Sequence, residues 1–250
     1  MTSRSLSLSG VDNFRDLGGW KVEGDKSVRY GVIFRSAHLA RASTEDLAIL
    51  SRLHINTIVD LRRESELRCA PNRVPPGAQQ HRFAIGCEGP SLLEEVLGGE
   101  CQAIDNRDVA ESYVSLLEDF APQYAAVIQL ICQRERLPLL IMCNAGKDRT
   151  GIVVALILAV LGAAPSQIVE EYALSNESWQ QRSAALIMQL KEAGVDIQSV
   201  AAGFRAPKAA MVSLLNHLDR KFGGAARFLV DVGALDPRAV TCLREVLLER

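Results

Sequence analysis

The sequence predicts one α/β domain, in which a mostly parallel central sheet is flanked by helices and followed by a helical C-terminal half. Short apolar runs alternate with segments of helical spacing along the first part of the chain, and only helical segments follow residue 150. The 250 residues are 48% hydrophobic and 23% charged, which fits one soluble globular domain. Because no repeat, low-complexity tract or long linker interrupts the chain, we expect residues 1–250 to form a single domain.

Four runs are expected to be strands. Residues 55–61 and 137–142 are short and mostly apolar, as buried strands are, and residues 28–34 and 82–85 are further candidates. Prolines and a glycine at 71–77 mark a loop between two of them. In a parallel sheet, ligands bind at the carboxyl ends of the strands. The end of the 137–142 strand is therefore the first place to look for a site.

Apolar residues at helical spacing predict the helices. The helix at 43–53 has Ser43 or Thr44 as its cap and acidic residues in its first turn, and the helix at 122–134 opens with a proline. A long apolar helix is expected from Thr150 onward. The others are expected at 108–120, 165–174, 177–193, 208–222, 225–232 and 237–248.

Composition excludes several classes of function. The net charge is −2, the pI is near 6.1, and Lys and Arg are scattered, so no broad basic face for nucleic acid is expected. The longest apolar run, 151–162, is about half of the roughly 20 residues that a membrane span needs. We expect no transmembrane segment. The Ser-rich first ten residues lack the apolar run of a secretory signal, so a cytoplasmic location is expected.

The cysteines and histidines do not form a metal motif. No C-x2-C pair occurs among the six cysteines, no histidine stands near one of them at ligand spacing, and the four histidines do not cluster. We therefore expect neither a metal nor a cofactor. Such cysteines are by default free thiols in a cytosolic protein.

One cysteine has neighbours that change this expectation. The segment Cys143-Asn144-Ala145-Gly146-Lys147-Asp148-Arg149-Thr150, here called the cysteine loop, joins the apolar strand at 137–142 to the long apolar helix. A thiol becomes a nucleophile as its thiolate, which positive charge and a helix N-terminus favour. The spacing lets the backbone N–H groups of Asn144, Ala145, Gly146 and Lys147 surround one tetrahedral anion.

The loop side chains fit the same chemistry. The planar guanidinium of Arg149 can hold two oxygens of a phosphate, and Gly146 permits the turn without a Cβ clash. The hydroxyl of Thr150 is expected to stabilise the thiolate, and Gly151 is expected to let the helix pack closely on the loop. A buried thiol beside a solvated charge run is the simpler explanation. The preceding strand, the glycine and the following helix together favour an anion site with a nucleophile.

These residues resemble the bacterial tyrosine phosphatase family related to mycobacterial protein tyrosine phosphatase B, within the cysteine-dependent phosphatases. The resemblance extends over nearly the whole chain. Besides the loop, its motifs are Asn13-Phe14-Arg15-Asp16-Leu17-Gly18-Gly19, Phe34-Arg35-Ser36, Val59-Asp60-Leu61-Arg62 with Glu66, Phe222-Gly223-Gly224, and residues 243–247. The resemblance implies a phosphotyrosine-phosphatase-like fold, a cysteinyl-phosphate intermediate, no metal, and activity on phosphotyrosine. It also implies phosphoserine, phosphothreonine or phosphoinositide as further substrates.

One position departs from the family pattern, and the general acid is open between several carboxylates. Most members have His where Met142 precedes the cysteine. Asp148 matches the family's in-loop acid and is the first candidate for protonating the leaving group. Asp60 is the second, with a structural salt bridge as its alternative role. Asp105 and Asp108 are more typical of a helix N-terminus.

The remaining charged residues are expected to support the site. Lys147 is predicted to bind substrate and, by resemblance, to face a phosphoinositide headgroup, whereas a solvated lysine is the plain alternative. Arg15, Arg35 and Arg62 are candidates for substrate contact, but arginines in strand-end motifs are often structural, so we expect them to be supporting residues. The leading hypothesis is a phosphatase acting on a phosphorylated protein, peptide or phosphoinositide. A rhodanese-like sulfurtransferase and a non-catalytic phosphate-binding module are the alternatives.

Overall fold

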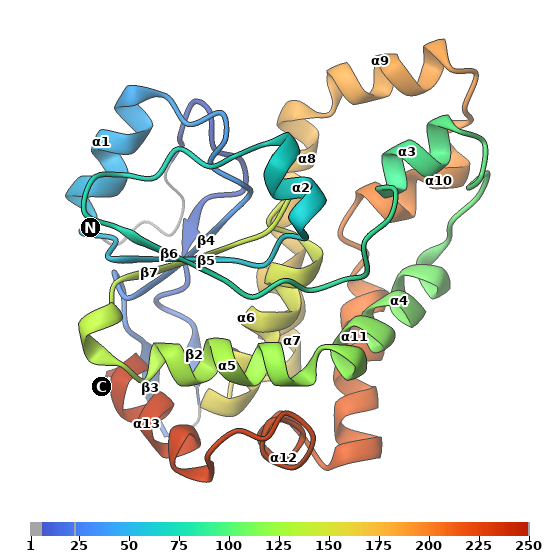
Figure 1. The fold of residues 1–250 in the computed structure, drawn as a ribbon. Helices are drawn as coiled ribbons and strands as arrows, with labels where there is room; N and C mark the ends of the chain where they lie inside the picture. The colour runs from blue at the N-terminus through green and yellow to red at the C-terminus, as the bar shows by residue number, and fades with distance from the viewer. Residues whose placement is uncertain (1–6, 23, 250) are drawn as a thin grey trace.

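The computed structural model describes residues 7–22 and 24–249, and a five-stranded sheet lies at its centre (Figure 1). The strand order is β1-β4-β7-β5-β6. Four strands are parallel: β4 (Ile33–Ser36), β7 (Leu139–Met142), β5 (Thr57–Asp60) and β6 (Gln79–Arg82). The edge strand β1 (Arg15–Asp16) is antiparallel to β4. The mostly parallel sheet predicted from the sequence is confirmed.

A second, antiparallel sheet was not predicted. It contains β2 (Lys21–Val22), β3 (Lys26–Val28) and β8 (Leu248–Glu249), so it joins the N-terminal hairpin to the end of the chain. The single strand expected at 28–34 is wrong, because the chain turns at Gly31, whose φ of +73° suits glycine, and divides the run into β3 and β4.

The strand expected at 82–85 is also wrong. Strand β6 ends at Arg82 and is built from polar residues, because it is the sheet edge and is largely exposed. The apolar residues that follow still bond to the neighbouring segment: Phe83 N donates to Asp60 O (2.9 Å) and Ile85 N to Leu61 O (3.1 Å). The apolar pattern therefore identified the segment that follows β6 and not the strand β6 itself.

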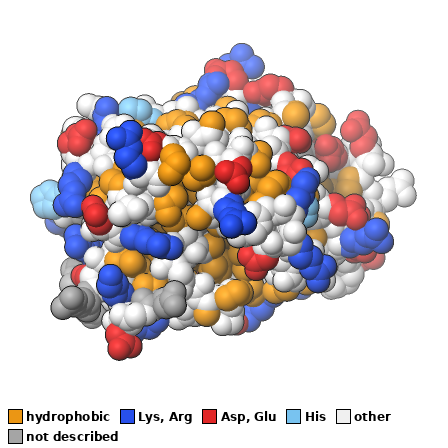
Figure 2. All heavy atoms as spheres, turned by 90° about the horizontal axis from the view of Figure 1, so that it is seen from below, with side chains coloured by type: hydrophobic (Ala, Val, Ile, Leu, Met, Phe, Trp, Pro, Cys, Tyr) orange, Lys and Arg blue, Asp and Glu red, His pale blue; other side chains and the backbone are white. Residues whose placement is uncertain are grey.

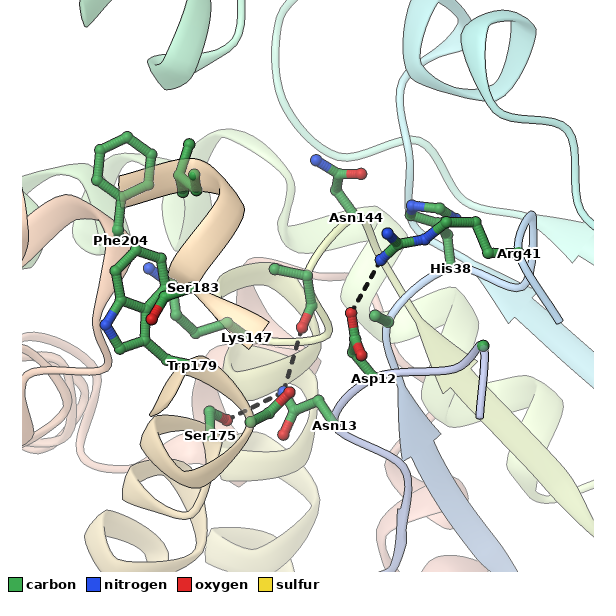
Figure 3. A pocket seen from close by; sticks show the side chains of 15 residues that line it. Asp12, Asn13, His38, Arg41, Asn144, Lys147, Ser175, Trp179, Ser183 and Phe204 are labelled. Carbon is green, nitrogen blue, oxygen red and sulfur yellow. Dashed lines mark hydrogen bonds and ion pairs between the residues drawn. The ribbon is translucent and has the colours of Figure 1, made fainter. Parts of the chain in front are cut away.

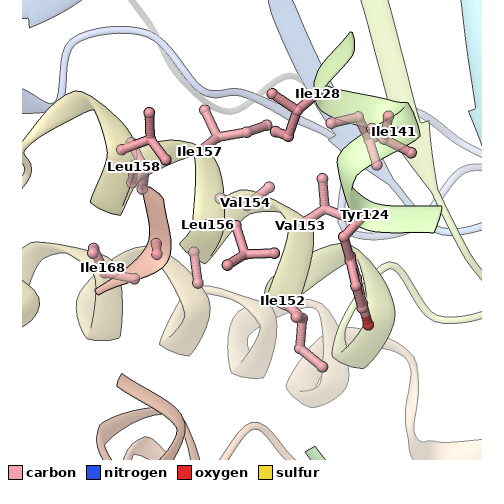
Figure 4. Packing of buried hydrophobic residues seen from close by; sticks show 14 of the residues in the cluster. Tyr124, Ile128, Ile141, Ile152, Val153, Val154, Leu156, Ile157, Leu158 and Ile168 are labelled. Carbon is pink, nitrogen blue, oxygen red and sulfur yellow. The ribbon is translucent and has the colours of Figure 1, made fainter. Parts of the chain in front are cut away.

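Alternate side chains of the sheet enter two separate cores, as a period of two requires. Phe34, Ile58, Leu140 and Met142 pack with α1 (Thr44–Arg52) and the N-terminal segment. The other face, with Ile141 and Cys143, packs against α6 (Asp148–Leu161), in which all but three of fourteen residues are buried. Figure 4 shows the α6 side chains of this second core. The apolar helix expected from Thr150 is thus confirmed and begins two residues earlier.

The remaining helices surround α6 and extend to one side (Figure 1). The part of the chain before β7 adds α2 (Glu64–Cys69), α3 (Leu92–Leu97), α4 (Asn106–Asp119), α5 (Ala121–Ile131) and η1 (Arg134–Arg136). The C-terminal half adds α7 (Pro165–Ala173), α8 (Ser175–Arg182), α9 (Ala184–Glu192), α10 (Ile197–Phe204), α11 (Lys208–His217), η2 (Leu218–Phe222), α12 (Ala225–Asp231) and α13 (Pro237–Leu247). The helical C-terminal half is confirmed.

Some helix predictions need correction. The helix expected at 177–193 is two helices, α8 and α9, separated at Ser183. Helices α2, α3 and α10 were not predicted, because they are short and their apolar residues cover small areas: Val96, Leu190 and Val200 form a separate cluster between α3, α9 and α10. Helices of this length depend on tertiary packing for their stability.

The surface carries charges of both signs. On the face seen in Figure 2, Lys and Arg alternate with Asp and Glu around scattered apolar side chains. Among residues 7–22 and 24–249, no helix is both long and apolar enough to cross a membrane. The cytoplasmic location stays a prediction.

Candidate active site

The cysteine loop lies between the carboxyl end of β7 and the N-terminus of α6, where the sequence placed it. The side chain of Cys143 is buried, whereas Asn144 and Ala145 are exposed at the mouth of the loop. Gly146 has φ +64°, and a Cβ there would lie 2.3 Å from the carbonyl carbon and oxygen of Ser36. Only glycine fits both constraints. The loop therefore packs against the end of β4.

Donors outside the loop hold its carbonyl groups. His38 N donates to Asn144 O (3.2 Å), and the amide of Asn13 donates to Ala145 O (3.2 Å) and Gly146 O (2.8 Å). The guanidinium of Arg35 also donates to Gly146 O. A peptide group turns its C=O and N–H to opposite sides, so outward carbonyls direct the N–H groups to the centre of the loop. That arrangement suits an anion above Cys143.

Two arginines and one glutamate are buried under the loop; with Asn13 they are called the support network. Arg15 Nε donates to Glu171 Oε1 (2.7 Å) and Arg35 to Glu171 Oε2 (2.6 Å). Burial, together with the charge of Arg15, lowers the pKa of Arg35 to about 10. Although burial opposes ionisation of Glu171, the two arginines lower its pKa. With two positive groups for one negative group, the network keeps excess positive charge beneath the nucleophile.

Arg149 is held by a carboxylate that sequence reasoning had noted only as part of a motif. Its two terminal nitrogens donate to Glu66 Oε2 (2.6 Å) and Oε1 (2.7 Å), a bidentate pair. Burial alone would raise the pKa of Glu66, but the hydrogen bonds and charge of Arg149 bring it down to about 2. Burial likewise opposes the charge of Arg149, and Glu66 and Cys143 raise its pKa. The guanidinium is thus fixed and charged.

Asp148 occupies the first position of α6, with its side chain 35% exposed. Its Oδ1 accepts a hydrogen bond from the hydroxyl of Tyr113 and lies 3.4 Å from Lys147 Nζ. The second oxygen has no hydrogen-bond partner in the described part of the chain. This carboxyl group is partly accessible and has one oxygen available for proton transfer.

Thr150 is completely buried, and its hydroxyl has no hydrogen-bond partner among the described residues. A buried polar group without a partner is costly and needs an explanation, of which a catalytic role is one. Gly151, next in the helix, packs on Tyr172 of α7 rather than on the loop: a Cβ would lie 3.0 Å from the ring. The packing of this glycine on the loop, expected from the sequence, is therefore wrong: the close approach is to α7.

Lys147 is turned toward α10. Its ammonium donates to Gly203 O (2.6 Å) and Arg205 O (2.9 Å), and its side chain is only 8% exposed. The residue therefore links the cysteine loop to the C-terminal end of α10. Its predicted contact with substrate stays a prediction, and the alternative of a plain solvated lysine does not describe this geometry.

The other acid candidates have structural positions. Asp60 is fully buried and pairs with Arg62 (2.8 Å), and it also accepts hydrogen bonds from Asn72 and Gln80. It lies beside Met142 on the neighbouring strand, as expected. Its carboxylate is nevertheless part of a buried ion pair. Asp105 caps α4 by accepting hydrogen bonds from the N–H groups of Arg107 and Asp108. Asp105 and Asp108 therefore lie at a helix N-terminus, as the sequence indicated.

Met142, which stands where most family members have His, is fully buried in the apolar core on the α1 side of the sheet. Its carbonyl accepts from Leu61 N (2.9 Å). The side chain points to the face opposite Cys143, because neighbouring residues of a strand alternate. The support network holds the loop carbonyl groups instead.

A pocket of about 250 Å³ opens beside the loop (Figure 3). Asn144, Ala145 and Lys147 of the loop line it together with Trp179 of α8 and Phe204 of α10. The two aromatic rings are stacked, with centroids 5.9 Å apart. Polar groups and an apolar wall thus lie next to the exposed part of the loop. In the described part of the chain, no group of three or more His, Cys, Asp or Glu is arranged to hold a metal ion.

Sequence reasoning missed the partners of the loop. Glu66 was noted in a motif without a role, and Glu171, Tyr113 and Tyr172 were not noted. An acidic residue three positions after an apolar one on the same helix face, as Glu171 is after Ile168 in α7, was the available signal. The two tyrosines carried no such signal, because a tyrosine at helical spacing is typical of a core residue.

Comparison with known proteins agrees with this geometry. The family model described as "Tyrosine phosphatase family" matches residues 6–249. A Cupriavidus necator protein with the provisional name tyrosine-protein phosphatase H16_A0669 is 30% identical over 76% of this chain and 70% of its own length. The triple specificity protein phosphatase PtpB of Mycobacterium tuberculosis is 30% identical over 74% of each chain.

Solved structures are more distant. The core catalytic domain of the PP-IP phosphatase SIW14 from S. cerevisiae aligns with 74% of this chain and 95% of its own, at 15% identity and a TM-score of 0.39. The full-length family match and the two bacterial relatives confirm the resemblance seen in the sequence: the chain belongs to the tyrosine phosphatase family and is a cysteine-dependent phosphatase.

Proposed function

We propose that the protein hydrolyses phosphotyrosine, and that Cys143, Arg149, Asp148 and Thr150 carry the reaction. The observation that carries this proposal is the loop itself: its carbonyl groups are held outward around a buried cysteine, and Arg149 is fixed by Glu66 at its rim. Phosphate oxygens would bind to the loop N–H groups and to the guanidinium.

The reaction has two steps. In the first, the Cys143 thiolate attacks phosphorus, an S–P bond forms, the P–O bond to the leaving group breaks, and Asp148 gives its proton to the leaving oxygen. In the second, water attacks phosphorus, the S–P bond breaks, and the proton of water passes to the Asp148 carboxylate. Thr150 would donate its hydroxyl to the sulfur as the thiolate is released.

The substrate class follows from the surroundings of the loop. The stacked pair of Trp179 and Phe204 offers apolar contact to an aryl group beside the loop. The relative from M. tuberculosis is named a triple specificity phosphatase, so phosphoserine and phosphothreonine are further candidates. A phosphoinositide is less favoured, because the Lys147 ammonium donates to two backbone carbonyls of this chain.

Replacing the nucleophile tests the proposal. Cys143→Ser should lower the turnover of p-nitrophenyl phosphate by at least ~10³-fold and still bind a phosphotyrosine peptide. Cys87→Ser is the matched control, because Cys87 is an exposed thiol, and it should keep wild-type turnover. Substantial turnover by the Cys143→Ser protein would contradict the proposal.

A substrate panel separates the alternatives. Phosphotyrosine, phosphoserine and phosphoinositide are assayed with the wild type and with Lys147→Ala. We expect phosphotyrosine to be hydrolysed fastest. Sulfur transfer from thiosulfate without phosphatase activity would indicate a rhodanese-like enzyme. Phosphate-competitive peptide binding without release of inorganic phosphate would indicate a binding module.

A further inference from the structure

A pair of buried tyrosines lies beneath the carboxyl group of Asp148. Tyr113 comes from α4 and Tyr172 from α7, and their hydroxyl oxygens are 2.6 Å apart. The rings meet edge to face, with centroids 6.0 Å apart. Tyr113 contacts Asp148 Oδ1 on the third helix, α6. Helix α4 thus meets α6 and α7, which follow one another in the sequence, in one hydrogen-bonded chain.

The direction of this chain follows from its protons. Burial and the charge of Asp148 raise the pKa of both tyrosines above the ordinary value, so both hydroxyls stay protonated in the pH range of an enzyme. Each hydroxyl has one proton to donate. When Asp148 is ionised, Tyr113 donates to Oδ1, and Tyr172 therefore donates to the oxygen of Tyr113. Neither tyrosine is itself the proton donor for the substrate.

We propose that Tyr113 is a positioning residue for the general acid: it holds Oδ1 of Asp148, so that Oδ2 is the oxygen that carries the transferred proton. This inference rests on the proposed role of Asp148 in the reaction. Lys147 Nζ lies 3.4 Å from the same Oδ1, and the side chain of Asp148 is 35% exposed. Without the tyrosine hydroxyl, the carboxyl group could rotate toward the lysine and the solvent. Misplacement of a catalytic group by about 1 Å is enough to slow a reaction strongly.

Three tyrosines allow a matched series of hydroxyl deletions. Tyr113→Phe removes the donor to Asp148. Tyr172→Phe removes only the donor to Tyr113. Tyr124→Phe is the control: Tyr124 of α5 is equally buried, packs beside α6 (Figure 4), and its hydroxyl has no partner among the described residues. Thermal unfolding of each variant establishes that the fold is kept.

The substrates are chosen for their leaving groups. p-Nitrophenolate leaves readily without a proton, whereas the oxygen of phenyl phosphate or of O-phosphoserine needs the acid. Asp148→Asn should lower kcat for phenyl phosphate by ~10²-fold and for p-nitrophenyl phosphate much less. Tyr113→Phe should show the same pattern with a loss of ~10-fold, Tyr172→Phe a loss of about 2-fold, and Tyr124→Phe none.

The double variant Tyr113→Phe/Asp148→Asn decides whether the two residues act together. No further loss beyond that of Asp148→Asn supports positioning. An additive loss, or an equal loss of kcat with every leaving group, would show Tyr113 to be structural only and would overturn the inference. If Asp148→Asn itself shows no dependence on the leaving group, the general acid has been assigned wrongly. The inference then fails with it, while the Cys143→Ser result stands separately.

Discussion

The two sides of the cysteine loop differ in how their polar groups are used. Under the loop, Arg15, Arg35 and Glu171 are almost fully buried, and both arginines are bound to the glutamate. On the reaction side, Asp148 is 35% exposed with one oxygen available, and the buried hydroxyl of Thr150 has no partner among the residues described. The first group holds the loop shape, and the second has capacity left for a substrate. Variants under the loop should therefore lose mainly stability, and variants on the reaction side should lose mainly activity.

The largest effect is expected under the loop. Glu171→Gln leaves two buried guanidiniums without their counter-charge, and this should lower the free energy of unfolding by about 3–5 kcal/mol. Denaturant unfolding measures it. Glu170→Gln is the control, because Glu170 is exposed and paired with Lys208 at the surface, and such a pair contributes about 0–1 kcal/mol. Equal losses for the two variants would remove the distinction between the two sides.

On the reaction side, Arg149→Lys should reduce kcat/KM by ~10²–10³-fold, because an ammonium cannot reproduce the planar bidentate fork. The unfolding midpoint should change little by comparison with Glu171→Gln. Steady-state kinetics with p-nitrophenyl phosphate gives the measurement. Arg107→Lys, at an exposed arginine paired with Glu111 on α4, should be silent. A loss of stability without a loss of rate would place Arg149 in the supporting group.

Glu66 should make stability depend on acid pH. Its pKa is about 2 in the folded protein, against 4.5 for an unperturbed glutamate. A lowered pKa stabilises the fold fully above about pH 4.5, and this contribution is lost as the pH falls toward 2. The unfolding midpoint of Glu66→Gln should therefore fall less steeply than that of the wild type between these values. Parallel curves would mean that the Arg149–Glu66 pair adds nothing to stability.

The smallest effect is expected at Thr150. Thr150→Val removes a buried hydroxyl without a described partner, so stability should be unchanged or slightly raised while kcat falls by about 10-fold. Thr57→Val is the matched control, since Thr57 is also buried, its hydroxyl has no partner among the described residues, and it lies at the opposite end of its strand from the site. A burst of product followed by slow turnover would locate the loss in hydrolysis of the cysteinyl-phosphate. An unchanged kcat would leave Thr150 a core residue.

Much of the loop could be predicted because its information is local. Cys143, Gly146, Arg149 and Thr150 lie within eight residues between an apolar strand and an apolar helix, and both elements were found from their patterns. The prediction of one strand at 28–34 was wrong because the chain turns at Gly31, and the apolar pattern gives no sign of that turn. The short helices α2, α3 and α10 were not predicted, because tertiary packing stabilises them and their sequences show little periodicity.

The sequence by itself determined the order of strand, loop and helix around Cys143 and the chemistry of the loop, because both depend on residues next to one another in the chain. Only the tertiary structure decided that Glu66 holds Arg149, that Glu171 binds two arginines, and that Tyr113 contacts Asp148. These partners are separated by 35 to 156 residues. Their pairing depends on how helices pack on the sheet, which side-chain type and spacing do not specify.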